Sequence, residues 1–134
     1  MLLSEATSAV VAVGLDPAIG LLHADHERRP SLALDLMEEF RPLIVDQVVV
    51  SAALRGQLRP DHGRRDDEIA GVLLTRAGRT VVLDAYERRM LQGTKGALQG
   101  FTGSWRRHLY RQAQRLASAI MRPGELWTGL SWRP

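Results

Sequence analysis

The stretch Gly14 to Pro42, GLDPAIGLLHADHERRPSLALDLMEEFRP, decides the interpretation of this chain. Its second half predicts a helix that starts at Ser31, a residue type favoured at the N-cap. Apolar residues such as Leu36 and Phe40 recur along this segment and predict that one face of the helix is buried. Pro42 has no backbone N–H and is expected to kink or end the helix.

The same helix carries acidic residues at positions that invite a metal-site hypothesis. Asp35, Glu38 and Glu39 are spaced i, i+3 and i+4, so they share one helix face and can converge on one point. Three carboxylates within one turn repel each other unless a cation or arginines offset their charge. His23 lies one loop earlier and can bring an imidazole beside this face. One imidazole with carboxylates suits Mn²⁺ or Mg²⁺ better than a closed zinc site.

The spacing alone also fits an ordinary alternative. An acidic cluster on an amphipathic helix is most often a solvated face, and a single histidine after an apolar run is more often packed or capped than a ligand. His23 and His26, three residues apart, form only a weak metal-binding pattern.

The rest of the chain predicts a single, mostly α domain of about five helices over residues 1–134. Valines 48–50 make a strand possible within the segment 43–54, which is otherwise expected to be helical. The other helices are expected at residues 2–13, 43–54, 75–91 and 104–121, the last two capped by Thr75 and Ser104. Between or after them we expect a polar loop over 56–71, a short strand at 71–74, a flexible glycine-rich loop at 93–103 and an irregular tail at 122–134.

Composition narrows the class of protein. The chain has no cysteine, which excludes a disulfide scaffold, a cysteine nucleophile and a thiolate metal site, and fits a cytoplasmic protein. No apolar run approaches the roughly 20 residues that span a bilayer, so no membrane partner is expected. Residues 1–50 carry 8 acidic and 3 basic side chains, whereas residues 51–134 carry 7 acidic and 15 basic ones. This change of sign suggests a metal-binding portion beside a phosphate-binding portion.

Arginines supply the candidate contacts to nucleic acid. Arg107, Arg111 and Arg115 are spaced i, i+4 and i+8 on the last predicted helix and form a cationic stripe suited to phosphates. Arg28, Arg29 and Arg41 flank the acidic helix and are further candidates. For each of them the alternative is a surface arginine paired with a nearby acid, as Arg88 or Arg89 with Glu87 or Asp84. A helix-turn-helix over residues 71–90 is a minor alternative, because no recognition-helix pattern supports it.

Beyond spacing, the stretch GLDPAIGLLH followed by PSLALDLMEEFRP resembles a known family. That family is the CRISPR-associated integrase-endonuclease of spacer acquisition, the first-numbered CRISPR-associated protein. The resemblance covers essentially the whole chain. It continues through Leu58-Arg59-Pro60, Gly71-Val72-Leu73-Leu74-Thr75, Tyr86-Glu87-Arg88-Arg89 and Gln114-Arg115-Leu116.

The resemblance implies the helical C-terminal catalytic domain of that family. It implies that His23 and Glu38 are metal ligands for Mg²⁺ or Mn²⁺ and that Asp35 lines the same site. The family joins foreign DNA to a CRISPR repeat and cuts branched DNA in the reverse reaction. The implied partners are spacer-precursor and repeat DNA, a second copy of the family protein in a homodimer, and the second-numbered CRISPR-associated protein.

The sequence also departs from the family pattern. The first glutamate ligand of the family and its N-terminal β-rich domain have no counterpart within these residues. We therefore expect little or no nuclease activity from the 134 residues alone, since loss of a charged ligand weakens a metal site severely. Whether the chain is an enzyme stays open. The alternative is a catalytically inactive remnant, or a helical fragment that binds DNA or a partner.

Overall fold

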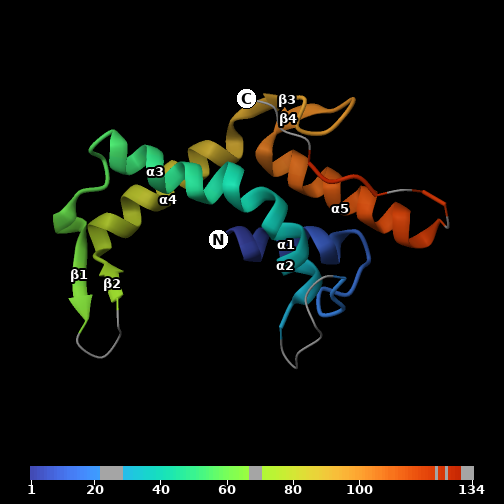
Figure 1. The fold of residues 1–134 in the computed structure, drawn as a ribbon, viewed down its shortest axis with the longest axis horizontal. Helices are drawn as coiled ribbons and strands as arrows, with labels where there is room; N and C mark the ends of the chain where they lie inside the picture. The colour runs from blue at the N-terminus through green and yellow to red at the C-terminus, as the bar shows by residue number, and fades with distance from the viewer. Residues whose placement is uncertain (22–28, 67–70, 123, 126, 131–134) are drawn as a thin grey trace.

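The structure is a computed structural model that describes residues 1–21, 29–66, 71–122, 124–125 and 127–130. Within these residues the chain is mostly α, as predicted, with five α-helices and two short antiparallel hairpins (Figure 1). The helices are α1 (Leu2–Ala12), α2 (Ser31–Arg41), α3 (Gln47–Leu54), α4 (Arg76–Leu91) and α5 (Trp105–Met121), with a π-helical segment η1 (Pro42–Asp46) and a 3-10 helix η2 (Pro60–His62). The hairpins pair β1 (Gly63–Asp66) with β2 (Gly71–Leu74) and β3 (Gly93–Lys95) with β4 (Thr102–Ser104).

The hydrophobic core lies where α1, α2 and α5 meet. Ala6 and Val10 of α1 are fully buried, and so are Phe40 of α2 and Trp105 of α5. These helices present apolar residues at helical spacing, and burying that stripe is the main source of their stability. Because α2 packs against both α1 and α5, only the side chains of α2 that face neither of these helices are exposed to solvent.

Pro42 ends α2, but the chain stays helical. Residues Pro42–Asp46 form a π-helical segment that leads directly into α3, so valines 48–50 are helical and the strand alternative is wrong. A proline cannot donate the N–H of the i→i−4 ladder, and a wider turn is one way to pass it. The carbonyl oxygen of Leu43 in this segment accepts from Arg89 of α4, at 3.0 Å from Nε and 2.7 Å from Nη2. Arg89 therefore ties the irregular turn to α4.

Two of the three predicted helix caps are present. Thr75 Oγ1 accepts the N–H of Gly78, and Ser104 Oγ accepts the N–H of Arg107, so α4 and α5 begin where predicted. Ser31 instead lies one residue inside α2 and is buried, with Pro30 at the N-cap. Within the part of the chain that the structure describes, no helix is long and apolar enough to cross a membrane.

Two segments that were predicted to be loops contain strands of the hairpins. Residues 63–66, expected to be loop, pair with 71–74 from Gly63 opposite Leu74 to Asp66 opposite Gly71. Residues 93–95 and 102–104 pair within the glycine-rich segment, whose Ala97 and Leu98 are buried. The described residues after α5 form neither helix nor strand.

The first hairpin rests closely on α4. A Cβ atom added at Gly78 would lie 2.6 Å from the carbonyl oxygen of His62, so only glycine allows this approach. That carbonyl also accepts from the N–H of Thr75, at 2.9 Å. The segment that carries the hairpin is therefore held at the start of α4.

Candidate functional site

Asp35 of α2 is buried and holds the chain that leads toward His23. Its side chain is 8% exposed, and its Oδ2 accepts the backbone N–H of Leu21 at 2.7 Å. Leu21 precedes His23 by two residues, so this hydrogen bond ties the start of the intervening loop to α2. His23 itself, and Arg28, lie outside the described residues. Asp35 thus acts as a fixed anchor for the candidate site.

Glu38 is the carboxylate of α2 that faces solvent. Its side chain is 46% exposed, and Oε1 lies 3.5 Å from Nη1 of Arg41. Arg41 is also exposed and lies 4.0 Å from Asp46 Oδ1. An exposed pair of this kind contributes little to stability, so the Glu38 carboxylate can exchange its partner at small cost.

Glu39 points into the protein rather than toward Glu38. Its Oε2 accepts from Nε2 of Gln112 on α5 and from the N–H of Leu130, both at 3.0 Å. Burial raises the pKa of this carboxyl, and the hydrogen bonds and the nearby Arg115 act against that rise. The prediction that all three carboxylates converge is therefore wrong. Glu39 joins α2 to α5 and to the tail.

Glu39 gives a first stability prediction. Glu39→Ala leaves the Gln112 amide and the Leu130 N–H without their acceptor, and we expect the free energy of unfolding to fall by about 1–3 kcal/mol. Glu38→Ala on the neighbouring exposed position should change it by less than about 0.5 kcal/mol. Urea unfolding of both variants measures the difference, and equal losses would contradict an anchoring role for Glu39.

The side chains of the candidate site are of the types that bind a divalent cation, but only some of them lie in the described part of the chain. Carboxylate oxygens from Asp35 and Glu38 are hard ligands of the kind that Mg²⁺ and Mn²⁺ prefer. Among the described residues, no group of three or more histidine, cysteine, aspartate or glutamate side chains is placed to hold one ion. The described residues alone therefore do not complete a metal site.

The three arginines of the α5 stripe are exposed or half-buried and turned along one side of the helix. Arg107 lies 5.8 Å from the centre of the Phe101 ring, Arg111 donates to Gln114, and Arg115 Nη2 donates to Thr128 at 2.5 Å. Within the described ranges, none of the three lies within 4 Å of a carboxylate. Their charges are thus available to an anionic ligand.

Two shallow hollows flank the stripe. One of about 350 Å³ lies toward the glycine-rich hairpin and one of about 410 Å³ toward the tail. Both are lined by Arg111, Gln114 and Arg115. The other arginine candidate with a described position, Arg29, is exposed beside the start of α2. The arrangement is a cationic surface with grooves on either side.

Arg106, the remaining arginine in this part of α5, has a structural role. Its Nε and Nη2 donate to the two carboxylate oxygens of Glu5 at 2.8 and 2.9 Å, and Nη2 also donates to Glu87. Tyr86 donates to the same Glu5, and burial raises the pKa of this phenol. The network joins α1, α4 and α5. Sequence reasoning missed it, because its members are far apart in the chain and no local spacing connects them.

Comparison with solved structures gives the class of this fold. Residues throughout the chain superpose on a Cas1 protein from Thermotoga maritima, with a TM-score of 0.79 and 25% identity over 95% of this chain and 38% of the other. A casposase bound to its integration product gives a TM-score of 0.84 at 24% identity, covering 99% of this chain and 38% of that one. The chain thus shares its fold with part of a Cas1 protein and with part of a casposase.

Sequence comparison then gives the family. The sequence model of the CRISPR-associated protein Cas1 matches residues 1–88, and the chain belongs to that family. A CRISPR-associated endonuclease Cas1 from Thermus thermophilus is 42% identical over 133 residues, which is 99% of this chain and 41% of the relative. The chain therefore spans about two fifths of that relative's length. The family assignment made from the Gly14–Pro42 stretch is confirmed.

Proposed function

We propose that this chain is the helical, metal-binding part of a Cas1 integrase-endonuclease that inserts spacer DNA at CRISPR repeats. The observation that carries the proposal is the family match over residues 1–88, which includes His23, Asp35 and Glu38. The buried, hydrogen-bonded Asp35 supports it, because that contact fixes the chain next to His23 against the acidic helix.

In this proposal His23 and Glu38 hold Mg²⁺ or Mn²⁺ and Asp35 orients the site. The bound cation would polarise a DNA phosphodiester and neutralise charge that develops during its attack by a hydroxyl group. Glu38 would exchange its exposed contact with Arg41 for the cation. Arg41, released in this way, would then lie beside the reacting phosphate, where Arg28 and Arg29 also contribute.

The α5 stripe would hold the DNA backbone outside the reacting phosphate. The partners of the whole protein would be spacer-precursor DNA, the CRISPR repeat, a second Cas1 copy in a homodimer, and the second-numbered CRISPR-associated protein. Arg107, Arg111 and Arg115 support DNA as the ligand, because they place three positive charges along one side of α5 and none of them forms a described ion pair within 4 Å.

A DNA-binding prediction follows from the stripe. The triple variant Arg107→Gln, Arg111→Gln and Arg115→Gln should weaken binding of a short duplex by roughly 100-fold at low salt and lower the salt slope by about 2 to 3. Fluorescence anisotropy over a salt series measures both quantities. Arg106→Gln is not a suitable control because it breaks the Glu5 network, whereas Arg122→Gln removes a charge already paired with Glu125. Unchanged affinity in the triple variant would contradict the proposed role.

The function itself is tested with branched DNA and Mn²⁺. We expect the chain to bind this DNA more tightly with Mn²⁺ and to cleave it little or not at all, since the family resemblance implies a further glutamate ligand that these residues do not include. His23→Ala should remove the Mn²⁺-dependent part of the binding. Strong Mn²⁺-dependent cleavage lost in His23→Ala would show that no further ligand is needed. Absence of both DNA and Mn²⁺ binding would contradict the function.

A second candidate is a helical fragment that binds DNA or a partner without catalysis. The cationic α5 stripe favours it, because a phosphate-binding surface needs no metal ion. The two candidates differ in one measurable property, because only the integrase proposal requires Mn²⁺ binding that depends on Glu38.

A further inference from the structure

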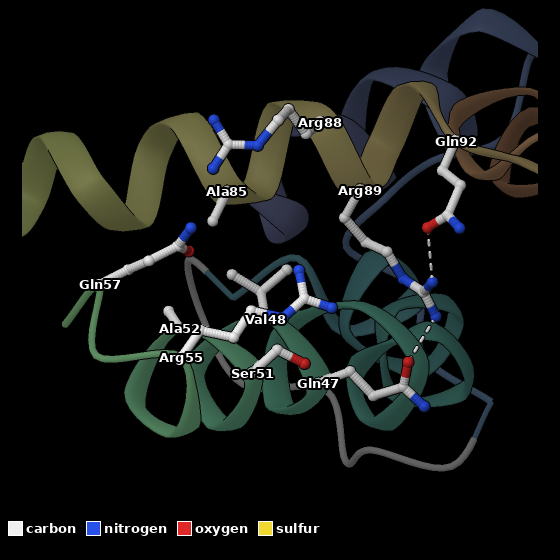
Figure 2. Close-up of a pocket in the computed structure, with 10 residues that line it drawn as sticks. All are labelled: Gln47, Val48, Ser51, Ala52, Arg55, Gln57, Ala85, Arg88, Arg89 and Gln92. Carbon is white, nitrogen blue, oxygen red and sulfur yellow. Dashed lines mark hydrogen bonds between the residues drawn. The ribbon is translucent and has the colours of Figure 1, made fainter.

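A polar groove between α3 and α4 is separate from both the acidic helix and the α5 stripe. The two helices lie side by side, on the other side of the view from α5 in Figure 1. The groove between them has a volume of about 460 Å³ and shares no lining residue with the hollows beside the stripe. Figure 2 shows its lining residues: Gln47, Val48, Ser51, Ala52, Arg55, Gln57, Ala85, Arg88, Arg89 and Gln92.

The lining of the groove is cationic and contains no carboxylate. Three arginines line it, Arg55 at the C-terminal end of α3 and Arg88 and Arg89 on α4. The Arg89 side chain already donates hydrogen bonds to Leu43, Gln47 and Gln92. Grouping three positive charges without an acidic partner is unfavourable unless an anion offsets the repulsion.

Two of these guanidinium groups, those of Arg55 and Arg88, are available to bind a ligand. Arg55 and Arg88 are exposed, and their side chains have no hydrogen-bond or ion-pair partner within the described ranges. The alternative pairing of Arg88 with Glu87 is not observed, since the Glu87 carboxylate receives Arg106 instead. The guanidinium groups of Arg55 and Arg88 can therefore each donate two parallel hydrogen bonds to the oxygens of a phosphate group.

The floor of the groove adds a feature that suits a nucleotide. Val48 and Ala52 are buried beneath it and Ala85 is half-buried, so the floor is apolar and made of small residues. Ser51 and the amides of Gln47 and Gln57 lie at its edges. An apolar floor between cationic edges accommodates a sugar or base while the guanidinium groups contact the phosphates on either side.

We propose that the α3–α4 groove is a second phosphodiester-binding site, which takes a DNA strand through Arg55 and Arg88. This inference rests on the proposed function, because it assumes that the ligand of the whole chain is DNA. It adds to that function a contact surface between α3 and α4 that shares no lining residue with the hollows beside the α5 stripe. An acidic protein surface is the competing ligand, and the test distinguishes it.

The test compares two double variants with equal loss of charge. Arg55→Gln with Arg88→Gln removes the available guanidinium groups of the groove. Arg59→Gln with Arg64→Gln is the matched control, because these exposed arginines already lie 3.6 and 3.9 Å from Asp61 and Asp66 and line neither the groove nor the hollows beside the stripe. The probe is a fluorescent single strand of about 12 nucleotides, within the usual site size of strand-binding proteins. Anisotropy is measured over a series of salt concentrations.

We expect the groove variant to bind the strand roughly 10-fold more weakly and to lower the salt slope by about 1.4, whereas the control changes little. Circular dichroism and the thermal midpoint should match the wild type, since both arginines are exposed. If the α5 triple variant loses affinity while the groove variant binds like the control, the groove inference is wrong and the proposed function stands.

Two further outcomes would overturn the inference in different ways. If the wild-type chain binds no DNA at any salt concentration, the proposed function fails and the groove site fails with it. If a fluorescent polyglutamate peptide binds in a manner that depends on Arg55 and Arg88 while the DNA strand does not, the groove is a protein-binding surface instead.

Discussion

Arg89→Ala is expected to lower the free energy of unfolding by about 2–4 kcal/mol. The substitution leaves the half-buried Leu43 carbonyl of the π-helical segment without its two Arg89 donors, and a hydrogen bond from a charged donor is worth about 1.5–3 kcal/mol. It also removes the guanidinium that lies 5.1 Å from the centre of the buried Trp105 ring, a contact worth about 0.5–2 kcal/mol. Contacts to Gln47 and Gln92 are lost as well (Figure 2).

The reason for a large effect is that Arg89 donates from two atoms to a carbonyl oxygen within the π-helical segment. Pro42 cannot donate within the helix, and the segment that follows it has π rather than α geometry. Burial lowers the pKa of Arg89, yet arginine remains charged in proteins, so its donors stay available to Leu43. A lysine at this position supplies charge without the planar fork, and Arg89→Lys should recover only part of the lost stability.

Arg88→Ala is the matched control for this prediction. Arg88 is adjacent and exposed, so its removal should change the free energy of unfolding by less than about 0.5 kcal/mol. Urea unfolding monitored by tryptophan fluorescence and circular dichroism measures both variants, because Trp105 lies against the Arg89 side chain. Equal stability of the two variants would show that the π-helical segment does not depend on Arg89.

Local signals in the sequence predicted the parts of the fold that local interactions determine. Thr75 and Ser104 cap α4 and α5 as predicted, because a side-chain oxygen can reach the free N–H three residues ahead in any context. Ser31 failed as a cap, since Pro30 occupies that position and Ser31 is buried inside α2. The short strand at 71–74 was predicted and forms β2, whereas β1, β3 and β4 were missed because they are only three or four residues long and lack alternating apolar residues.

Spacing alone could not predict which carboxylates of the acidic cluster are buried and which are exposed. Helical periodicity placed Asp35, Glu38 and Glu39 on neighbouring positions, but distant segments decide which of them is buried. Glu39 is taken by Gln112 and Leu130, which lie 73 and 91 residues later in the chain. The family resemblance selected Glu38 rather than Glu39, and the exposure of Glu38 is consistent with that choice.

Glu38→Ala is expected to reduce Mn²⁺ affinity by at least about 100-fold. Loss of a residue that only hydrogen-bonds to a metal ligand typically costs 10–100-fold in metal affinity, and removal of a ligand itself should cost more. Asp35→Asn keeps an oxygen acceptor for the Leu21 N–H but removes the charge, so a smaller loss of roughly 10-fold is expected. Electron paramagnetic resonance of free Mn²⁺ in a titration of the chain measures the affinity without any need for enzymatic activity.

Glu39→Gln provides the decisive comparison, because it removes one negative charge from the residue next to Glu38. Its amide oxygen can still accept from the Leu130 N–H, so the tail contact is retained while the charge is lost. If α2 attracts Mn²⁺ only through its overall negative charge, Glu38→Ala and Glu39→Gln will weaken binding equally. If Glu38 is a ligand, Glu39→Gln will change the affinity by no more than about twofold, because the half-buried Glu39 side chain is turned toward α5 and is not a ligand in this proposal.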